Sequence, residues 1–367
     1  MRILMLNYEF PPLGGGAGNA TYYLLKQFSN YKDLEIDLVT SSTGNYKKEQ
    51  FSKNINIHYL DINKKENIHF QTNKDLLTYS WKAKKYSEEL IKNKKYDLAH
   101  AFFGIPCGYI AMKLGLPYIV SLRGSDVPFY NSRFKYLDKF VFKNLSKKIW
   151  NRAGKVIANS SDLKNLALES SPLQKIDVIY NGIDINEFIP LNKRIENSKL
   201  KFISTGRLTK RKGYDNLIKT FRNLKDYELT LIGEGDEEIH LKNLAVEYKV
   251  NVQFLGKQPH DKISAYLQEA DIFVLPSINE GMSNSILEAM SCGLPIITTD
   301  TGGAKEIIKK NGYIVEKGHE ESLGKALQAY LSNKTLLKEH SIESRKLAES
   351  MSWEKIARKY FDEYSLG

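Results

Sequence analysis

The chain has 367 residues, of which 42% are hydrophobic and 26% are charged, and its net charge is +11. This length predicts two domains, and the ordinary globular composition excludes a mini-protein and a generally disordered chain. The two cysteines, Cys107 and Cys292, are too few for a disulfide framework or a cysteine-built metal site, so a reducing compartment is expected.

Short aliphatic runs in the first half predict strands at residues 2–8, 35–41, 55–60, 97–102, 118–122, 155–159 and 177–180. The rhythm restarts in the second half, at residues 201–205, 228–232, 252–255, 271–275, 295–299 and 313–315. Continuous hydrophobicity is typical of parallel strands whose sheet is covered by helices on both faces. We therefore predict an α/β protein with two doubly wound Rossmann-like domains, residues 1–185 and 186–351, facing each other across a cleft. Ligands of such sheets bind beyond the carboxyl ends of the strands.

Most of the positive charge lies in the first half and is densest between residues 131 and 155, where eight basic residues accompany one acidic residue. Apolar residues recur there at helical spacing, which predicts an amphipathic basic helix. Such a helix is a solvated face or a contact with an anionic membrane or a phosphorylated acceptor. Nucleic acid is not expected, because no helix-turn-helix, RNA-binding or zinc-finger pattern accompanies it. The apolar runs are too short for a secretory signal or a membrane span, so we expect a cytoplasmic protein.

The first predicted strand ends in a glycine-rich turn, PPLGGGAG, which precedes a helical pattern. Backbone N–H groups and the positive end of a helix dipole suit a phosphate at such a turn. The turn contains neither a GxGxxG fingerprint nor a Walker A motif. A flexible glycine loop is the alternative.

Two further loops of the second half follow predicted strands. In the first, Arg207 and Lys212 could stabilise the negative charge of a departing diphosphate, although basic loops are also commonly just solvated. The second, containing Gly233 and Glu234, permits close backbone approach by a ligand or is an ordinary turn.

The most informative segment follows the strand predicted at 271–275. Glu280 is expected in the loop, and Glu288 more than a turn inside the next helix, so the two carboxylates would reach different parts of a ligand. The N–H groups that begin this helix would add an anion site between them. A helix cap plus a surface glutamate is the alternative.

In combination, the segments PPLGGGAGNAT, STGRLTKRKG, LIGEGDE and EGMSNSILEAMSCGLP resemble those of the family-four retaining glycosyltransferases of the GT-B fold, group 1. The resemblance covers nearly the whole chain. It implies transfer of a sugar from a nucleotide-sugar donor to a glycan or lipid-linked acceptor, with retained anomeric configuration and no cofactor or metal ion. It also implies a role in polysaccharide or glycolipid assembly, and a C-terminal helix, about 352–367, that packs on the first domain. With the basic 131–155 segment, we expect the protein in the cytoplasm or at the inner face of the membrane.

Carried over by position, the resemblance assigns Arg207 and Lys212 to the donor diphosphate, Glu280 to the sugar hydroxyls and Glu288 to the ribose. The residues implied to bind the donor or its nucleotide are Gly15, Gly16, Gly233, Glu234, Phe254, Gly256, Gly281, Met282, Ser283, Asn284 and Glu288.

The chain departs from the family in SLRGSDV, where Arg123 stands at the position that often carries a histidine. An arginine stays charged, so it could orient a phosphate or hydroxyl but hardly serve as a general base. His100 is the remaining histidine at a comparable strand end, and is either catalytic or buried. Asp126 either contacts sugar or acceptor, or caps a helix.

Two other function classes fit parts of the sequence. Glu280 and Glu288 could be the acid and base of a glycoside hydrolase or phosphorylase, which would act without a nucleotide donor. The basic 131–155 segment could lead a non-catalytic module that binds membranes or nucleic acid, with strong salt dependence.

Overall fold

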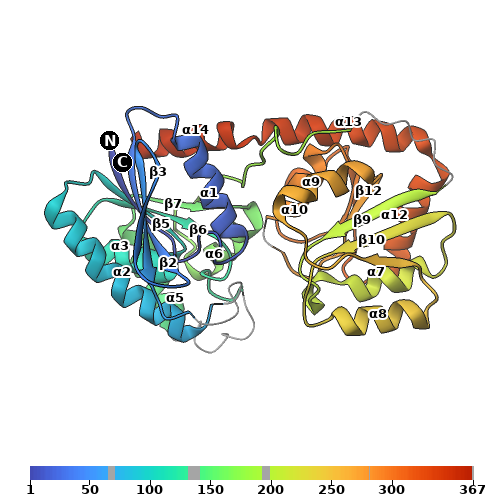
Figure 1. The fold of residues 1–367 in the computed structure, drawn as a ribbon, viewed down its shortest axis with the longest axis horizontal. Coiled ribbons are helices and arrows are strands. Elements are labelled where there is room, and N and C mark those ends of the chain that lie inside the picture. The colour runs from blue at the N-terminus through green and yellow to red at the C-terminus, as the bar shows by residue number, and fades with distance from the viewer. Residues whose placement is uncertain (65–70, 131–140, 192–198, 281, 366–367) are drawn as a thin grey trace. The chain divides into compact units, whose positions relative to one another are not determined.

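The computed structural model describes residues 1–64, 71–130, 141–191, 199–280 and 282–365 (Figure 1). The chain forms two compact units, Met1–Asn181 with Trp353–Gly367, and Gly182–Ser352. Each is an α/β unit built on a largely parallel sheet, as the sequence predicts. All thirteen predicted strands are present, with ends shifted by at most two residues.

The first unit has an eight-stranded sheet in the order β3-β4-β2-β1-β5-β6-β7-β8. Its strands are β1 Arg2–Leu6, β2 Glu35–Ser42, β3 Lys47–Ser52, β4 Ile55–Asp61, β5 Leu98–Phe102, β6 Tyr118–Leu122, β7 Lys155–Ala158 and β8 Asp177–Val178. All neighbours run parallel except β3, which pairs antiparallel with β4. The central strand β1 is almost wholly buried, as parallel strands covered on both faces require.

The helices of the first unit are α1 Gly16–Phe28, α2 Asn73–Asn93, the π-helical turn η1 Gly104–Gly108, α3 Tyr109–Leu114, α5 Lys143–Arg152, α6 Ser161–Ser170 and α14 Trp353–Ser365. Helix α2 begins with a capping box between Thr72 and Asp75, which satisfies backbone N–H groups at both positions. Helix α6 begins where the Ser160 hydroxyl accepts from the Leu163 N–H.

The predicted 131–155 helix needs correction. Residues 131–140 lie outside the described residues, and the described helix α5 ends at Arg152. Lys155 belongs instead to strand β7, where its ammonium pairs with Asp177 at 3.1 Å and with Glu363 at 2.9 Å. The helix therefore stops before the last of the basic residues, because Lys155 takes part in the sheet.

Helix α14 follows the whole second unit in sequence yet packs in the core of the first. The indole of Trp353 stacks on the ring of Tyr23 at a centroid distance of 6.0 Å. Tyr364 lies against Phe28, with ring centroids 5.7 Å apart. Five α14 side chains are buried: Trp353, Ile356, Ala357, Tyr360 and Tyr364.

The second unit has a six-stranded, wholly parallel sheet in the order β11-β10-β9-β12-β13-β14. Its strands are β9 Leu200–Thr205, β10 Tyr227–Ile232, β11 Val252–Phe254, β12 Ile272–Leu275, β13 Ile296–Thr299 and β14 Gly312–Val315. Its helices are the 3-10 turn η4 Lys210–Lys212, α7 Tyr214–Phe221, α8 Glu238–Glu247, α9 His260–Glu269, α10 Asn284–Ser291, α11 Ala304–Ile307, α12 Glu320–Ser332 and α13 Lys334–Ser350. Across the described parts of both units, the helices are too short or too polar to cross a membrane.

Candidate donor site

Three loops meet at the carboxyl edge of the second sheet, after β9, β10 and β11. The Gly206 N–H donates to the Ile232 carbonyl, and the Gly233 N–H donates to the Gly256 carbonyl, both at 2.9 Å. Gly233 has φ +145°, and a Cβ there would lie 1.9 Å from the Gly206 carbonyl oxygen. Only glycine lets the loops approach this closely, so Gly233 holds the loops after β9 and β10 together.

Lys212 and Glu280 approach one another from neighbouring strands. Lys212 ends the turn η4 after β9, Glu280 follows β12, and their side chains form an ion pair. The Ser277 hydroxyl also donates to Glu280 Oε1 at 3.1 Å. Because only 10% of the lysine side chain and 12% of the glutamate side chain are exposed, each charge offsets the burial of the other. A cation and a hydroxyl-binding carboxylate are thus held side by side.

The loop that carries Lys212 is kept against the loop after β12 by its backbone. The Ile278 N–H donates to the Arg211 carbonyl at 2.7 Å. A Cβ on Gly213, at φ +68°, would lie 2.3 Å from the Pro276 carbonyl oxygen. Arg207, in the same basic loop, is exposed.

Two residues predicted to bind the nucleotide, Glu234 and Phe254, lie nearby and are partly accessible to solvent. Glu234 is exposed and pairs with Lys257 at 3.4 Å. Phe254 is half-buried, and the Lys242 ammonium lies 5.8 Å from its ring centroid. Both groups leave part of their surface to solvent.

Helix α10 begins beside Glu280. Ser283 precedes the first helical residue, Asn284, and its hydroxyl bonds to the Ser285 hydroxyl at 3.0 Å. The Ser283 side chain makes no hydrogen bond to the backbone N–H groups of this first turn. Met282 is buried, whereas the predicted Gly281 lies outside the described residues. The dipole and N–H groups of this helix end favour an anion.

Glu288 projects from the second turn of α10 and meets His260, the first residue of α9. Glu288 Oε1 lies 3.1 Å from His260 Nε2, and Glu187 Oε1 lies 3.5 Å from His260 Nδ1. The hydrogen bond with Glu288 raises the pKa of His260, against the lowering effect of its burial. Sequence reasoning missed His260, because nothing in its local pattern links it to a carboxylate 28 residues later.

In the first unit, Gly15 and Gly16 are exposed at the start of α1. The Gly15 N–H donates to Glu9 Oε2 at 3.2 Å, and a Cβ on Gly15 would meet nothing within 4 Å. An anion at this turn would therefore compete with the Glu9 carboxylate for the Gly15 N–H.

His100 is buried in the first unit, where a substrate cannot reach its ring. Its side chain is fully buried, with Nδ1 at 2.7 Å from the Tyr364 hydroxyl and Nε2 at 2.8 Å from the Ser121 hydroxyl. Burial, and secondarily the charge of Arg123, lowers the pKa of His100 well below its ordinary value. These contacts argue against the predicted catalytic role and make His100 part of the packing of α14 on the sheet.

The Asp126 carboxylate accepts hydrogen bonds from the backbone of two loops and does not cap a helix. Its Oδ2 accepts the Gly104 N–H at 2.6 Å, and its Oδ1 accepts the Arg123 and Gly124 N–H groups at 2.9 and 3.0 Å. Burial raises the pKa of Asp126, although these N–H groups lower it. The carboxylate ties the loop after β5 to the loop after β6, which argues against the predicted sugar contact and against a helix cap.

Arg123 links three parts of the first unit. Its guanidinium donates to Asn181 Oδ1 at 2.8 Å and to the Tyr360 hydroxyl at 3.2 Å, and lies 4.7 Å from the Phe102 ring centroid. These partners hold the guanidinium against α14. These contacts engage the guanidinium predicted to orient a phosphate or a hydroxyl.

The described residues contain no group of three or more His, Cys, Asp or Glu side chains arranged to hold a metal ion.

Comparison with known proteins matches both units. Residues 14–187 match the family described as Glycosyltransferase Family 4, and residues 186–347 match Glycosyl transferases group 1. The chain is a family-four glycosyltransferase. Together the two matches run through nearly the whole length of this glycosyltransferase, in agreement with the motifs of its sequence.

Two relatives illustrate the range of similarity. The glycosyltransferase is 28% identical to the uncharacterized glycosyltransferase MJ1178 of Methanocaldococcus jannaschii, over 100% of this chain and 99% of the relative. It is 34% identical to the amylovoran biosynthesis glycosyltransferase AmsK of Erwinia amylovora, over 42% of each chain.

Two solved structures share the fold. Sucrose-phosphate synthase (tll1590) from Thermosynechococcus elongatus has a TM-score of 0.85 at 19% identity, covering 100% of this chain and 98% of that one. Anabaena Alr3699/HepE, in complex with UDP and glucose, has a TM-score of 0.74 at 20% identity, covering 100% and 99%. The glycosyltransferase therefore has the GT-B fold that its sequence predicts.

Proposed function

We propose that this glycosyltransferase moves a sugar from a nucleotide-sugar donor to a glycan or lipid-linked acceptor, with retention of anomeric configuration and without a metal ion. The Lys212–Glu280 pair at the carboxyl edge of the second sheet carries the proposal, since it sets an ammonium, which suits a diphosphate, beside a carboxylate, which suits sugar hydroxyls. The UDP and glucose bound to Alr3699/HepE support a nucleotide-sugar donor. The name of AmsK supports a place in polysaccharide biosynthesis, which we assign to the cytoplasm.

The arrangement of the loops supports the donor roles that we propose. Arg207 and Lys212 bind the diphosphate, and the first turn of α10 adds N–H groups directed at the same anion. Glu280 binds the hydroxyls of the donor sugar. Glu288, held by His260, binds the nucleotide ribose.

The reaction is a front-face displacement. The acceptor oxygen forms a bond to the anomeric carbon on the face from which the diphosphate leaves, and the bond between that carbon and the diphosphate oxygen breaks. The departing diphosphate takes the acceptor proton, so the chain needs no general base. This agrees with the burial of His100 and with the engagement of Glu280 by the Lys212 ammonium and of Glu288 by the His260 ring, which disfavours an acid–base pair of a hydrolase.

The first unit is proposed to receive the acceptor. Helix α5 buries Ile149 and Trp150 and exposes Lys148 and Arg152 on its surface. This basic face would bring the enzyme to an anionic membrane that carries a lipid-linked acceptor. Nucleic acid is not a proposed partner.

Thermal unfolding against UDP, GDP and ADP sugars, with and without EDTA, tests the donor. A ligand at about 100 times its dissociation constant stabilises the native state by about 2.7 kcal/mol, which shifts the midpoint by about 5–10 °C for a unit of this size. We expect one base to give a shift that EDTA leaves intact. Absence of any shift, with nucleotide-free hydrolysis of an oligosaccharide, would overturn the proposal.

Turnover of matched variants tests the site. Loss of one charge-stabilising contact costs about 2.7–4 kcal/mol of barrier, so Arg207→Ala and Lys212→Ala should each lower kcat about 100- to 1,000-fold. Lys210→Ala is the control, because Lys210 is an exposed cation of the same loop. Near-normal rates in both test variants would refute the assignment, and the anomeric configuration of the product, measured by NMR, tests retention.

A further inference from the structure

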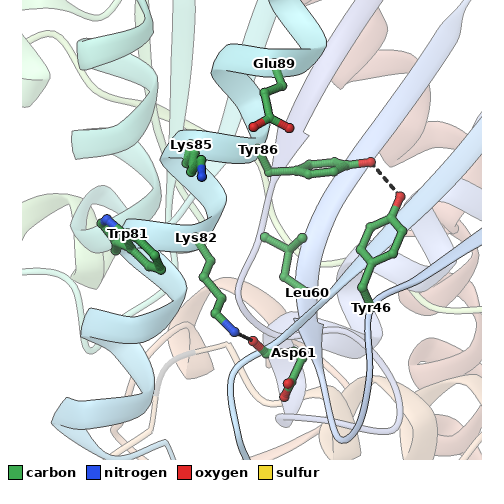
Figure 2. A pocket seen from close by; sticks show the side chains of 8 residues that line it. All are labelled: Tyr46, Leu60, Asp61, Trp81, Lys82, Lys85, Tyr86 and Glu89. Atoms are coloured by element: carbon green, nitrogen blue, oxygen red, sulfur yellow. Dashed lines mark hydrogen bonds between the residues drawn. The ribbon is translucent and has the colours of Figure 1, made fainter.

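An open pocket of about 400 Å³ lies in the first unit, between α2 and the carboxyl end of β4 (Figure 2). It is lined by Tyr46, Leu60, Asp61, Trp81, Lys82, Lys85, Tyr86 and Glu89. Figure 2 shows Lys82 and Tyr86 reaching from α2 toward Asp61 and Tyr46. The pocket shares no residue with the candidate donor site.

Two aromatic rings at this pocket are exposed to solvent. Trp81 is 66% exposed and Tyr46 is 51% exposed, whereas Trp150 and Trp353, the other two tryptophans of the chain, are buried. A large ring left in water gains free energy when a ligand covers it, and its flat face suits the C–H face of a pyranose ring.

A buried network fixes the hydroxyls of the pocket. Asp37 and His58 are 2% and 1% exposed, and Asp37 Oδ1 lies 3.1 Å from His58 Nε2. The Tyr86 hydroxyl lies 2.8 Å from His58 Nδ1, and the Tyr46 hydroxyl lies 2.7 Å from that of Tyr86. Four groups thus run in a single chain from the core to the pocket.

The charge of Asp37 fixes the direction of the hydrogen bond at the buried end of this network. Burial opposes ionisation of Asp37, but hydrogen bonds from His58, Lys94 and Tyr96 outweigh it and hold the pKa of Asp37 far below its ordinary value. Because an ionised carboxylate only accepts, His58 Nε2 carries a proton. The Tyr86 hydroxyl bonds to His58 Nδ1 and to the Tyr46 hydroxyl, which ends the network at the pocket. A phenol oxygen keeps a lone pair whichever way these bonds run, so the Tyr46 oxygen can accept a hydrogen bond from a ligand.

The charges of the pocket balance. The Lys82 ammonium donates to the Asp61 carbonyl at 2.6 Å, and Lys85 lies one turn further along α2. The carboxylates of Asp61 and Glu89 oppose these two cations. Donors and acceptors around flat rings match the hydroxyls of a neutral sugar, and the balanced charges give no net attraction for an anionic group such as a lipid phosphate.

We propose that this pocket binds a neutral saccharide unit of the acceptor glycan. The saccharide covers Trp81 and Tyr46, and the Tyr46 oxygen accepts a hydrogen bond from one of its hydroxyls. The identity of that saccharide as acceptor rests on the proposed function, whereas its binding to the pocket does not. The pocket is then an acceptor subsite that recognises a sugar of the glycan by its ring face and its hydroxyls.

Iodide quenching of tryptophan fluorescence on the full chain tests this, because the exposed Trp81 is quenched while the two buried indoles are shielded. Maltohexaose, cellohexaose and chitohexaose are the neutral probes, with hyaluronan hexasaccharide and phosphatidylglycerol vesicles as anionic comparisons. We expect at least one neutral hexasaccharide to protect Trp81. Protection by none of them, or only by hyaluronan or vesicles, would overturn the proposal.

Isothermal titration of variants with the protecting hexasaccharide locates the binding. Trp81→Ala should weaken it about tenfold, and Tyr46→Phe, which keeps the ring, should weaken it through loss of the oxygen alone. Lys92→Ala is the control, since Lys92 is an exposed residue of α2 that does not line the pocket. Unchanged affinity in both pocket variants would place the saccharide elsewhere and refute the assignment.

Nucleotide-sugar binding, measured by thermal unfolding on the same preparations, separates the two proposals. If the unaltered chain bound the donor but none of the neutral hexasaccharides, the pocket would be refuted and the proposed function would stand. If a neutral saccharide protected Trp81 but no nucleotide sugar bound, the saccharide pocket would stand and the proposed function would be refuted.

Discussion

The Lys212–Glu280 pair makes a prediction about stability that is independent of catalysis. About nine-tenths of each side chain is buried, and removing one partner of a buried pair leaves a charge uncompensated, which costs about 3–5 kcal/mol. Because about a tenth of each side chain is still exposed to solvent, we expect a cost at the lower end of this range, about 3 kcal/mol. Lys212→Met and Glu280→Gln should therefore each lower the midpoint of thermal unfolding by about 6–12 °C, at about 2–4 °C per kcal/mol. Removing both charges together should cost much less than the sum of the two single changes.

Differential scanning calorimetry of the two single variants and the double variant measures these shifts. Lys325→Met is the matched control, because Lys325 and Glu321 form an ion pair in the same unit with side chains 76% and 69% exposed. The control should leave the midpoint unchanged, as exposed pairs contribute little. If Lys212→Met shifted the midpoint no more than Lys325→Met, or if the single costs simply added, the desolvated pair would not exist as described.

Three further predictions concern stability. Gly233→Ala would set a methyl group 1.9 Å from the Gly206 carbonyl oxygen, so urea unfolding should show a loss of about 1–3 kcal/mol. The hydrogen bond with Glu288 raises the pKa of His260 above 6.5, so its stabilising contribution is complete below about pH 6.5 and is lost as the pH rises through the raised folded value. The stability gap between the native chain and His260→Gln should therefore narrow from pH 6 to about pH 9. Burial lowers the pKa of His100, so the unfolded chain alone takes up its proton below about pH 6.5, and His100→Gln should lose less stability on acidification than the native chain.

Sequence patterning was sufficient for most of the fold, because strands of a parallel sheet must be hydrophobic on both faces. The run Ile272–Leu275 is fully buried and could be identified from its letters alone. Strand β3, by contrast, was missed. Its sequence KKEQFS is polar and largely exposed, as suits an edge strand whose lysines discourage pairing with other chains, and such a strand lacks the hydrophobic signal.

The candidate site was predictable where motifs follow strands, and unpredictable where partners come from elsewhere. Lys212 and Glu280 lie after neighbouring strands of one sheet, so their proximity follows from its order. Neither the contact of Glu288 with His260 nor the packing of Arg123 on Tyr360 follows from spacing, since each joins segments that only tertiary folding brings together. A sequence motif therefore predicts which loop carries a residue, but it does not predict which side chains that residue contacts.

The position of α14 has a consequence for synthesis of the chain. The ribosome delivers Trp353–Ser365 only after the whole second unit, yet these residues complete the aromatic core around Tyr23 and Phe28. The amino-terminal half, although made first, therefore waits with part of its hydrophobic surface uncovered until translation reaches this helix. A message cut short before Trp353 yields a chain in which the later-made unit has all of its residues and the earlier-made one does not, so its exposed core marks it for chaperones and proteases.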